Sequence, residues 1–440
     1  MKRRTIISIR ELQAELDFEE AEHSPPFALP EYQRQLLASR IAAGFIDLAI
    51  TAAIFSIFAV TTYLEGPENF TLDRRVLGVY GVCYFALVTV YFFLFMLTAS
   101  QTPGMKFRGL IVSTTEDAPL DPKQACLRGF GYLISILPSV GNIAFSMKVK
   151  GQEVLRWPYA SVEEFKSRPA LSGIPFVGPW ANRLDEQAFY ANGKRYAFDM
   201  TLGNVRGAIP IHGFLSTTDR WRVIQAKADR NSAWLTSRLE FFKEPAWMKQ
   251  FPFAHTIDIT YRLQDGILEV RTKMTNMSAE PMPVSVGFHP YYKLTDSTRG
   301  EWTISVGAAK HWLLSPAKIP TGETEAVEKF FPNPSSAALK DYDLDDVFSD
   351  LIRDAQNRAH MMVKGKRQQL EIMLDPNWRS IVIWSPLAGV QGDRNFIAFE
   401  PMAGITDAMN LAQKSLYKEL QSIPPGGNWE ASFWIKPAGF

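Results

Sequence analysis

Two histidines and one glutamate stand in sequence contexts that could carry acid/base chemistry. His212 lies in Ile-His-Gly, His289 in Gly-Phe-His-Pro-Tyr-Tyr, and Glu400 in Phe-Glu-Pro. Proton transfer needs a group that takes a proton and a group that gives one, and imidazole is the side chain whose ordinary pKa lies nearest to neutrality. Because the three residues are far apart in the sequence, they can act together only if the fold brings their segments to one place.

Each of these residues also has a simpler interpretation. A histidine on a strand is more often a structural group, and a single glutamate is usually solvated. The other histidines are interpreted in this way, as structural or exposed: His23, His255, His311 and His360. The catalytic interpretation therefore rests on the joint occurrence of His212, His289 and Glu400.

The composition limits the class of protein. The chain has 440 residues, a length typical of about two to three domains, and its 47 Lys and Arg residues nearly balance its 46 Asp and Glu residues. No overall basic field favours nucleic acid as a partner. The chain contains two cysteines, Cys83 within an apolar run and Cys126, so a disulfide framework is not expected. This usage fits a soluble part that stays in the cytoplasm.

Two apolar runs near the N-terminus predict membrane helices. Residues 41–64 carry Asp47 as their single charged residue, and residues 76–98 carry none. A membrane span needs about 20 apolar residues, so each run is long enough to cross a bilayer. Buried core helices are the alternative, but two such runs joined by a short polar link disfavour it. We expect a polar cytoplasmic tail over residues 1–36, followed by two transmembrane helices.

The basic residues near these runs predict their orientation. They gather before the first run and after the second, with fewer in the link: Lys2, Arg3, Arg4, Arg10, Arg34 and Arg40; then Lys106, Arg108, Lys123 and Arg128; and Arg74 and Arg75 in the link. Cytoplasmic segments carry the excess of Lys and Arg, so both ends are expected inside. The predicted location is a multi-pass protein of the bacterial inner membrane with its C-terminal part in the cytoplasm.

Asp47 is an ionisable residue within the first apolar run. It follows Arg40 by seven residues, or two helical turns, so both lie on nearly one helix face. Ionisable groups inside a membrane are candidates for a functional site, here one that moves a solute or an ion. The simpler alternative is an arginine that snorkels at the boundary and an aspartate that pairs with a neighbouring helix.

Three motifs accompany the apolar runs: Arg40 to Asp47 (RIAAGFID), Gln101 to Lys106 (QTPGMK) and Leu120 to Arg128 (LDPKQACLR). Together they resemble the RDD family of small membrane domains, which implies such a domain over residues 37–130. Members of that family usually continue into a further hydrophobic helix. Here the uncharged residues 129–147 are interrupted by Pro138 and Gly141. We expect a soluble domain to begin at about Ser135, whereas a third span would carry it across the membrane.

The remainder of the chain, residues 135–440, predicts strands. Apolar residues alternate over residues 255–261 and 268–274, and Gln264-Asp265-Gly266 between them predicts a hairpin turn. Further short runs occupy residues 380–384, 395–399 and 431–435. Many short strands separated by Gly, Pro and Asp are typical of an antiparallel, all-β sandwich.

A series of motifs follows in order along this part: Gly173 to Leu184 (GIPFVGPWANRL), Ile211 to Gly213, Phe251 to Phe253, Leu268 to Asn276, Gly287 to Tyr292, Asp345 to Phe348, Phe399 to Pro401 and Ile423 to Trp429. The series resembles the aldose 1-epimerase (galactose mutarotase) family. The resemblance implies a mutarotase-type β-sandwich, or supersandwich, with a sugar site in its concave face. It implies a hexose as the ligand, and neither a metal nor an organic cofactor. A phosphorylated hexose is an alternative ligand, because Arg183 or another basic residue could hold a phosphate.

The resemblance also implies a role for each matching residue. Glu400 resembles the general base that takes the proton from the anomeric hydroxyl, and His289 resembles the general acid that protonates the ring oxygen. His212 resembles the group that holds or polarises this oxygen. Further positions resemble ligands of sugar hydroxyls: Asn182, Arg183 and Asp345, with Asp346 as the alternative to Asp345.

Two functions from different classes are therefore predicted. The first is a membrane-anchored aldose 1-epimerase, an isomerase that interconverts α and β anomers by acid/base ring opening. The second is a non-catalytic carbohydrate-binding or sensing module coupled to an RDD-type membrane or transport domain. The presence of His212, His289 and Glu400 favours the first, because binding alone needs hydroxyl ligands and aromatic faces but no matched acid and base.

Overall fold

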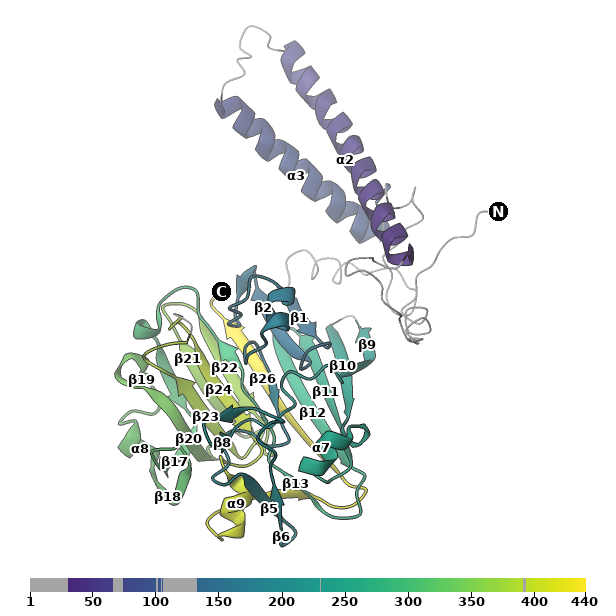
Figure 1. Cartoon of the computed structure of the whole chain (residues 1–440). Helices are drawn as coiled ribbons and strands as arrows, with labels where there is room; N and C mark the ends of the chain where they lie inside the picture. Colours follow the sequence, from purple (N-terminus) through teal and green to yellow (C-terminus); the bar gives the residue numbers. More distant parts are fainter. Residues whose placement is uncertain are drawn as a thin grey trace. The chain divides into compact units, whose positions relative to one another are not determined.

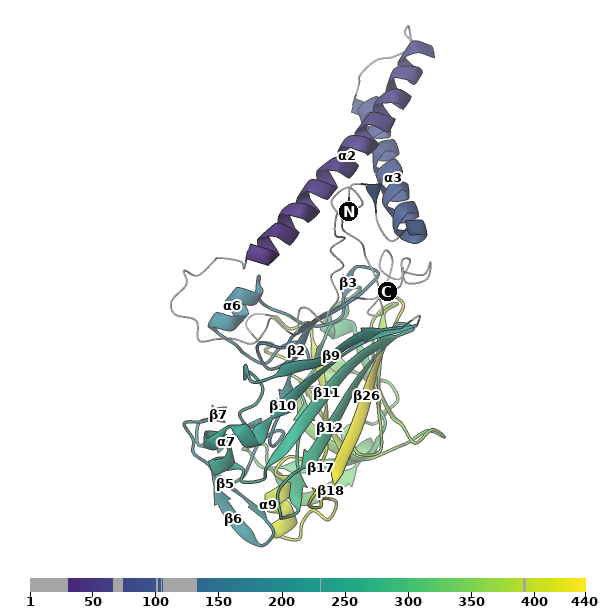
Figure 2. The same cartoon turned by 90° about the vertical axis from the view of Figure 1, so that its right-hand side faces the viewer.

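The chain divides into two compact units. In the computed structural model, the described residues are 31–65, 74–99, 102, 103, 105, 133–229, 231–390 and 393–440. The first unit covers Met1–Gly131 and the second Tyr132–Phe440. The first contains two long helices, and the second is built mainly of strands (Figures 1 and 2).

The helices of the first unit are α2 (Glu31–Glu65) and α3 (Arg74–Ala99). Both apolar runs are therefore helical, as the sequence predicts. Within α2, Ala42–Leu64 is long and apolar enough to cross a membrane, whereas the apolar segment found in α3 among the residues with described side chains, Val76–Phe92, is shorter. One candidate span is thus found among the described residues, and the second span stays a prediction.

Polar side chains connect α2 to α3 through hydrogen bonds. Asp47 is buried, the Tyr91 hydroxyl donates to its Oδ1 over 2.8 Å, and the Thr102 hydroxyl donates to its Oδ2. Thr51 lies 3.3 Å from the Tyr84 hydroxyl, and Thr62 lies 2.5 Å from the Tyr80 hydroxyl. Asp47 therefore contacts a neighbouring helix, in keeping with the simpler interpretation of this residue. The side chain of Arg40 lies outside the described part of the structure.

Two large antiparallel sheets form the second unit. The nine-stranded sheet has the order β19-β16-β21-β22-β26-β12-β11-β10-β9, and the eight-stranded sheet has the order β18-β17-β20-β23-β24-β14-β4, with β15 paired to β24. The strands of the first sheet are β9 (Arg222–Ala228), β10 (Ser232–Glu240), β11 (His255–Gln264), β12 (Ile267–Asn276), β16 (Thr303–Val306), β19 (Ala337–Ala338), β21 (Ala359–Lys364), β22 (Gln369–Leu374) and β26 (Asn428–Ala438). Those of the second are β4 (Phe176–Val177), β14 (Gly287–Phe288), β15 (Tyr291–Tyr292), β17 (Ala308–Leu314), β18 (Pro320–Ala326), β20 (Leu344–Leu351), β23 (Ser380–Ser385) and β24 (Ile397–Met402).

Smaller elements surround the two sheets. The strands are β1 (Leu133–Leu137), β2 (Ile143–Val149) and β3 (Gln152–Glu153); β5 (Ala188–Ala191) and β6 (Lys194–Ala197); β7 (Val205–Arg206) and β8 (Ile209–Pro210); and β13 (Met282–Val284) and β25 (Gln421–Ile423). The helices are α6 (Val162–Ser167), α7 (Pro245–Gln250), α8 (Val327–Phe330) and α9 (Ala408–Gln413). Strands β1 and β2, rather than a helix, thus occupy much of the uncharged stretch that follows the RDD-like motifs.

The hairpin predicted around Asp265 is formed by β11 and β12. Their register runs from His255 opposite Asn276 to Gln264 opposite Ile267. Asp265 and Gly266 both have positive φ, which a two-residue type I′ turn requires at its central positions. Burial alternates along both strands, so one face of the hairpin is turned to the core.

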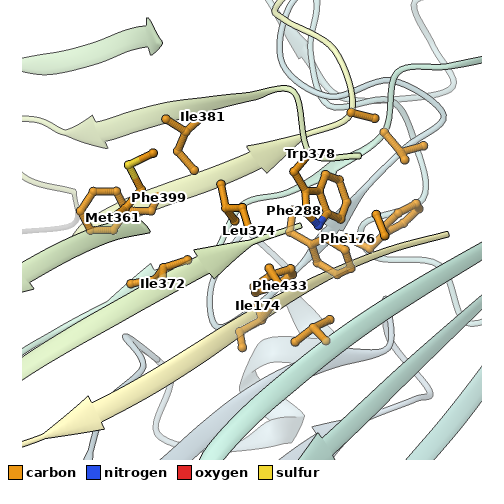
Figure 3. Close-up of a cluster of buried hydrophobic side chains, with 14 of the residues drawn as sticks. Ile174, Phe176, Phe288, Met361, Ile372, Leu374, Trp378, Ile381, Phe399 and Phe433 are labelled. Carbon is orange, nitrogen blue, oxygen red and sulfur yellow. The ribbon is translucent and has the colours of Figure 1, made fainter. Parts of the chain in front are cut away.

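The core lies between the two large sheets. Figure 3 shows Phe288 of β14 and Phe399 of β24 beside Phe433 of β26 and Met361 of β21, so both sheets contribute side chains. The rings of Phe288 and Phe433 lie 5.1 Å apart between centroids. Full burial of such a side chain stabilises the fold by about 1.5–3 kcal/mol.

This core decides which side chains of the eight-stranded sheet face away from it. Successive side chains of a strand point to opposite faces. Since Phe399 is turned to the core, the adjacent Glu400 is turned to the opposite face. The partner of Glu400 across the ladder is Val382, and Trp384 stands two residues further along the same strand and opposite Asp345. A glutamate, a tryptophan and an aspartate thus share the face of this sheet that points away from the core.

Candidate active site

His289 and Glu400 are in direct contact. His289 follows β14, Glu400 lies within β24, and Nε2 of the imidazole is 3.1 Å from Oε1 of the carboxyl group. Both side chains are buried. The ring of Tyr291 stacks on the imidazole at 4.6 Å between centroids, and the ring of Trp384 meets it edge-on at 5.4 Å. These two aromatic rings therefore fix the plane in which His289 meets Glu400.

His212 approaches the pair from the segment after β8. Its ring centroid lies 5.2 Å from that of His289. Its backbone N–H donates to the Asn182 carbonyl over 2.9 Å, and its Nδ1 accepts from the Asn182 backbone N–H over 3.1 Å. Because Nδ1 accepts a hydrogen bond, the neutral imidazole must carry its hydrogen on Nε2. His212 is therefore a hydrogen-bond donor at Nε2.

The backbone at His212 explains the tripeptide Ile-His-Gly. His212 and Asn182 both adopt positive φ, near 59° and 58°, which is uncommon for residues other than glycine. Gly213 also has positive φ, and a Cβ atom there would lie 2.0 Å from the Gly178 carbonyl oxygen. Only glycine can occupy this position without displacing the neighbouring chain. Left-handed residues of this kind tend to occur at functional sites.

The three predicted acid/base residues meet in one place. One nitrogen or oxygen from each of His212, His289 and Glu400 lies within 4.8 Å of the others, and all three side chains are buried. Two histidines and a carboxylate could in principle hold a transition metal. The hydrogen on Nε2 of His212 leaves this atom no lone pair for a metal, since Nδ1 is already engaged with Asn182. The trio therefore fits proton transfer better than metal binding.

Arg183 and Asp345 form a second polar group beside the trio. Nη2 of Arg183 donates to Oδ2 of Asp345 over 2.8 Å and Nη1 donates to Oδ1 over 3.3 Å, a two-pronged ion pair. Oδ1 of Asn182 accepts from the Arg183 backbone N–H and from Nη1, over 2.9 and 3.0 Å. The structure therefore brings together the three residues predicted as hydroxyl ligands.

The choice between Asp345 and Asp346 is decided by the strand. The two residues are adjacent on β20 and point to opposite faces. Asp345 contacts Arg183, whereas Oδ1 of Asp346 lies 3.2 Å from Nε2 of His311. Asp345 is therefore the member of the candidate site, and His311 is not a member.

Burial dominates the electrostatics of the trio. It raises the pKa of Glu400 well above the ordinary value, with a further contribution from the negative charge of Asp345 and an opposing one from Arg183. Burial also lowers the pKa of His289 to about 3. The pKa of His212 is lowered by burial first and then by His289, Arg183 and Arg206. Glu400 and His289 therefore hold a single proton between them over a wide range of pH.

Sequence reasoning missed two aromatic residues that shape the site. Tyr291 lies within the Gly-Phe-His-Pro-Tyr-Tyr motif, and Trp384 lies in a predicted strand, but neither was assigned a role. The signal for Trp384 is its position two residues after Val382, which faces Glu400 across the ladder. Without knowledge of which strands pair, that signal could not be used.

Two family models match the chain. The aldose 1-epimerase model matches residues 134–436, and the RDD family model matches residues 35–153. The two matches overlap at strands β1, β2 and β3, which the fold places with the second unit. The fusion expected from the sequence motifs is thereby confirmed.

Solved structures share the fold of the second unit. A galactose mutarotase-like protein from Clostridium acetobutylicum is 24% identical, with 71% of this chain and 94% of that chain covered and a TM-score of 0.62. An aldose epimerase homologue from C. elegans is 20% identical over 70% and 96% of the two chains, with a TM-score of 0.56. A galactose 1-epimerase from Lactobacillus acidophilus is 16% identical over 71% and 92%, also with a TM-score of 0.56. Since the aldose 1-epimerase model also matches more than half of the sequence, the chain belongs to the aldose 1-epimerase family.

Proposed function

We propose that this protein is a membrane-associated aldose 1-epimerase that interconverts the α and β anomers of a hexose. The observation that carries the proposal is the convergence of Glu400, His289 and His212, buried and within 4.8 Å of one another. Membership of the aldose 1-epimerase family supports an isomerase of this kind. The RDD match and the apolar helix α2 support association with a membrane.

The ring-opening step needs one base and one acid at the same carbon. Glu400 takes the proton from the hydroxyl on C1, the C1–O1 bond becomes a carbonyl, and the bond from C1 to the ring oxygen breaks. His289 gives a proton to that ring oxygen. Both oxygens are attached to C1, so an acid and a base that lie 3.1 Å apart can each reach one of them.

Closure of the ring reverses the roles. After rotation about the bond between C1 and C2, His289 takes the proton back from the hydroxyl that was the ring oxygen. Glu400 returns a proton to O1 as the C1 carbonyl is attacked from its other face. His212 donates a hydrogen bond from Nε2 to the former ring oxygen and holds this oxygen while the ring is open. It can donate from Nε2 because the hydrogen bond from the Asn182 backbone N–H to Nδ1 sets the tautomer of its imidazole. Protons and electron pairs balance without any further reactant.

The group of Asn182, Arg183 and Asp345 binds the sugar hydroxyls in this proposal. A hydroxyl both donates and accepts, and the guanidinium and carboxylate offer donors and acceptors side by side. Their two-pronged contact fixes the plane of the guanidinium before sugar arrives. Arg183 could equally contact a phosphate, so a phosphorylated hexose belongs among the substrates to be tested.

The test is anomer exchange measured by NMR on the full-length protein in detergent micelles. α-Galactose, α-glucose and glucose 6-phosphate are offered to the wild type and to Glu400→Gln. Loss of the general base is expected to slow exchange by about 10²- to 10⁴-fold. The matched control is Glu371→Gln, a partly buried glutamate on β22 that pairs with His360 and Lys436.

Two results would contradict the proposal. One is a folded wild-type protein that accelerates exchange of none of these sugars, and the other is unchanged exchange in Glu400→Gln. Sugar binding without exchange would favour the carbohydrate-binding function in its place. Equal loss in Glu371→Gln would show that the variants act through the fold instead of through the acid/base site.

A further inference from the structure

The turn after β24 lies against the segment that carries Arg183. At this turn Asp407 is buried and has a φ of 60°. Its backbone N–H donates to the Arg183 carbonyl oxygen over 3.1 Å. Its Oδ1 accepts from the backbone N–H of Asp185 over 2.9 Å. One residue therefore binds the main chain at Arg183 and again two residues further on.

We propose that Asp407 is a positioning residue that holds the Arg183 segment so that the guanidinium meets Asp345 and the sugar. Asp407 does not touch the reacting atoms in this inference and acts through Arg183. The inference rests on the proposed function, because it assigns Arg183 to sugar binding. It adds a residue that the motifs of the chain did not single out.

Helix α9 fixes the direction of the Asp407 carboxyl group. Nδ2 of Asn410 donates to Oδ1 of Asp407 over 2.8 Å and to the Ala188 carbonyl over 3.1 Å. Asn410 is fully buried, so its amide cannot exchange these partners for water. Oδ1 of Asp407 thus receives two donors, one from α9 and one from the Arg183 segment. Such a carboxyl group has little freedom to turn.

The proposed role of Asp407 needs a hydrogen-bond acceptor in its side chain but does not need a full negative charge. Burial raises the pKa of Asp407 to about 7, although the hydrogen bond from Asp185 opposes the shift. The charged groups facing it are Asp185 and Lys414, which form an ion pair with each other over 2.7 Å. A neutral carboxyl group still accepts through one oxygen. Asparagine should therefore replace Asp407 with little loss, whereas alanine should not.

Residues 400–407 connect the acid/base residues of the site to its proposed sugar-binding residues. Glu400 lies in β24, and Asp407 follows it after the short turn at residues 403–406. Residues 400–407 therefore place the proposed base and, through Asp407, the proposed sugar-binding arginine. A change at Asp407 should shift Arg183 while Glu400 stays on its strand. Binding of the sugar, measured by KM, should then suffer more than kcat.

The experiment compares variants of the full-length protein by NMR anomer exchange, with sugar affinity measured by titration calorimetry. Asp407→Ala is expected to raise KM by about tenfold, the factor expected for loss of about one hydrogen bond. The value of kcat is expected to change by less than about threefold. Asp407→Asn is expected to restore KM to within about twofold of the wild type. The matched control is Asp375→Ala, because the Asp375 carboxyl group also accepts two hydrogen bonds, here from the backbone N–H groups of Asn377 and Ser432, and its described hydrogen bonds involve no residue of the candidate site.

A double-mutant cycle separates positioning from general damage. If Asp407 acts through Arg183, Asp407→Ala should leave KM unchanged in an Arg183→Ala background. A full tenfold effect in that background, or no effect in the wild-type background, overturns the inference. Should Asp407→Ala fail to fold, Asn410→Ala replaces it, with an expected rise in KM of about threefold; an unchanged KM overturns the inference.

Failure of the proposed function is recognised separately. It appears as absent exchange in the wild type, or as an unchanged KM in Arg183→Ala alone. If exchange is absent but sugar binds, the dissociation constant takes the place of KM in the same cycle. A weaker affinity in Asp407→Ala that disappears in the Arg183→Ala background then supports the positioning role, and an unchanged affinity overturns it.

Discussion

Glu400 and His289 titrate as one pair. Burial raises the pKa of Glu400 and lowers that of His289 to about 3. The pair holds two protons only below about pH 3, one proton over a wide range above it, and none once the pH exceeds the raised pKa of Glu400. The order of the two pKa values places this proton on Glu400 in the sugar-free site. The reaction needs Glu400 free and His289 protonated, so the proton must first move from Glu400 to His289 across their 3.1 Å contact.

We therefore expect kcat/KM for anomer exchange to be flat across neutral pH and to fall on the alkaline side. The measurement is NMR exchange in a series of buffers from about pH 5 to about pH 10. The alkaline fall reports loss of the single proton of the pair. Activity that rises steadily toward high pH would contradict this assignment, because it would require only a free base.

Burial of Glu400 is also expected to lower the free energy of unfolding of the protein. Its folded-state pKa is raised above the ordinary value of 4.5, so folding favours the protonated form. Above pH 4.5 the unfolded chain loses this proton first, and the cost of burying the group grows until the pH reaches the raised folded pKa. Glu400→Gln is thus expected to unfold at a temperature a few degrees higher at pH 8, and at the same temperature as the wild type near pH 4. Differential scanning calorimetry at both pH values measures this, and a lower melting temperature at pH 8 would refute it.

The residues of the trio could be predicted because each stands in a short motif with a chemically distinctive side chain. The contacts around them could not. Trp384 lies beside the trio because β23 pairs with β24. Asp407 contacts the Arg183 segment because the turn after β24 brings its backbone N–H to the Arg183 carbonyl oxygen. The sequence also left Asp345 and Asp346 as alternatives, since the strand period of two gives the faces but not which face bears the site.

At the scale of elements, β20 connects the site to an ion-paired histidine behind it. Asp345 faces Arg183, while Asp346 faces His311 and its Oδ2 accepts from the Asp345 backbone N–H over 3.0 Å. His311 lies between Asp346 and Glu325, with its Nδ1 3.0 Å from the latter. Its ring packs on Phe330 with 4.0 Å between centroids.

His311 predicts how stability depends on pH. Burial lowers its pKa, but hydrogen bonds to Asp346 and Glu325 outweigh this and leave the pKa raised above 6.5. Its stabilising contribution is fully present below the unfolded pKa of 6.5 and is lost as the pH rises through the higher folded value. We expect the free energy of unfolding to fall between pH 6 and pH 9, and to fall less in His311→Gln. Urea titrations at each pH measure it; equal slopes for both proteins would contradict the prediction.

Elements with a periodic pattern could be predicted, and elements made by pairing could not. The hairpin of β11 and β12 shows the period of two over both arms, and its turn carries Asp265 and Gly266. Strands β4, β14 and β15 are two residues long each. Such segments are too short to show an alternating pattern of apolar residues. They are strands because adjacent strands of the same sheet supply their backbone hydrogen-bond partners. Strand β14 nevertheless places His289, so the site depends on elements that the sequence does not reveal.

At the scale of the whole molecule, the end of the RDD match is part of the sandwich. Met147, Val149 and Leu155 belong to the buried core of the second unit, although Met147 and Val149 also fall within the RDD match. A third membrane helix over residues 129–147 would remove Met147 from that core. Strands β1 and β2 therefore argue against a third membrane span over residues 133–147.

The number of spans decides the side on which the sandwich lies. The apolar segment Val76–Phe92 of α3 is about 25 Å long, whereas the whole uncharged run of residues 76–98 is about 34 Å long as a helix, compared with roughly 30 Å for a bilayer core. Two spans put the N-terminus and the sandwich on the same side, whereas a single span through α2 puts them on opposite sides. The basic residues before α2 favour the cytoplasm for the N-terminus.

We expect both ends to be cytoplasmic, and cysteine labelling in intact cells tests this. Cys83 and Cys126 are first replaced by serine, and single cysteines are placed at Lys2, at Asn69 in the link, and at Lys366, whose side chain is well exposed on the sandwich. With two spans, a membrane-impermeant maleimide should label Asn69→Cys in intact cells, and Lys2→Cys and Lys366→Cys only after permeabilisation. Labelling of Lys366→Cys from outside with Lys2→Cys protected would mean one span, and the proposed sugar site would then face away from the cytoplasm.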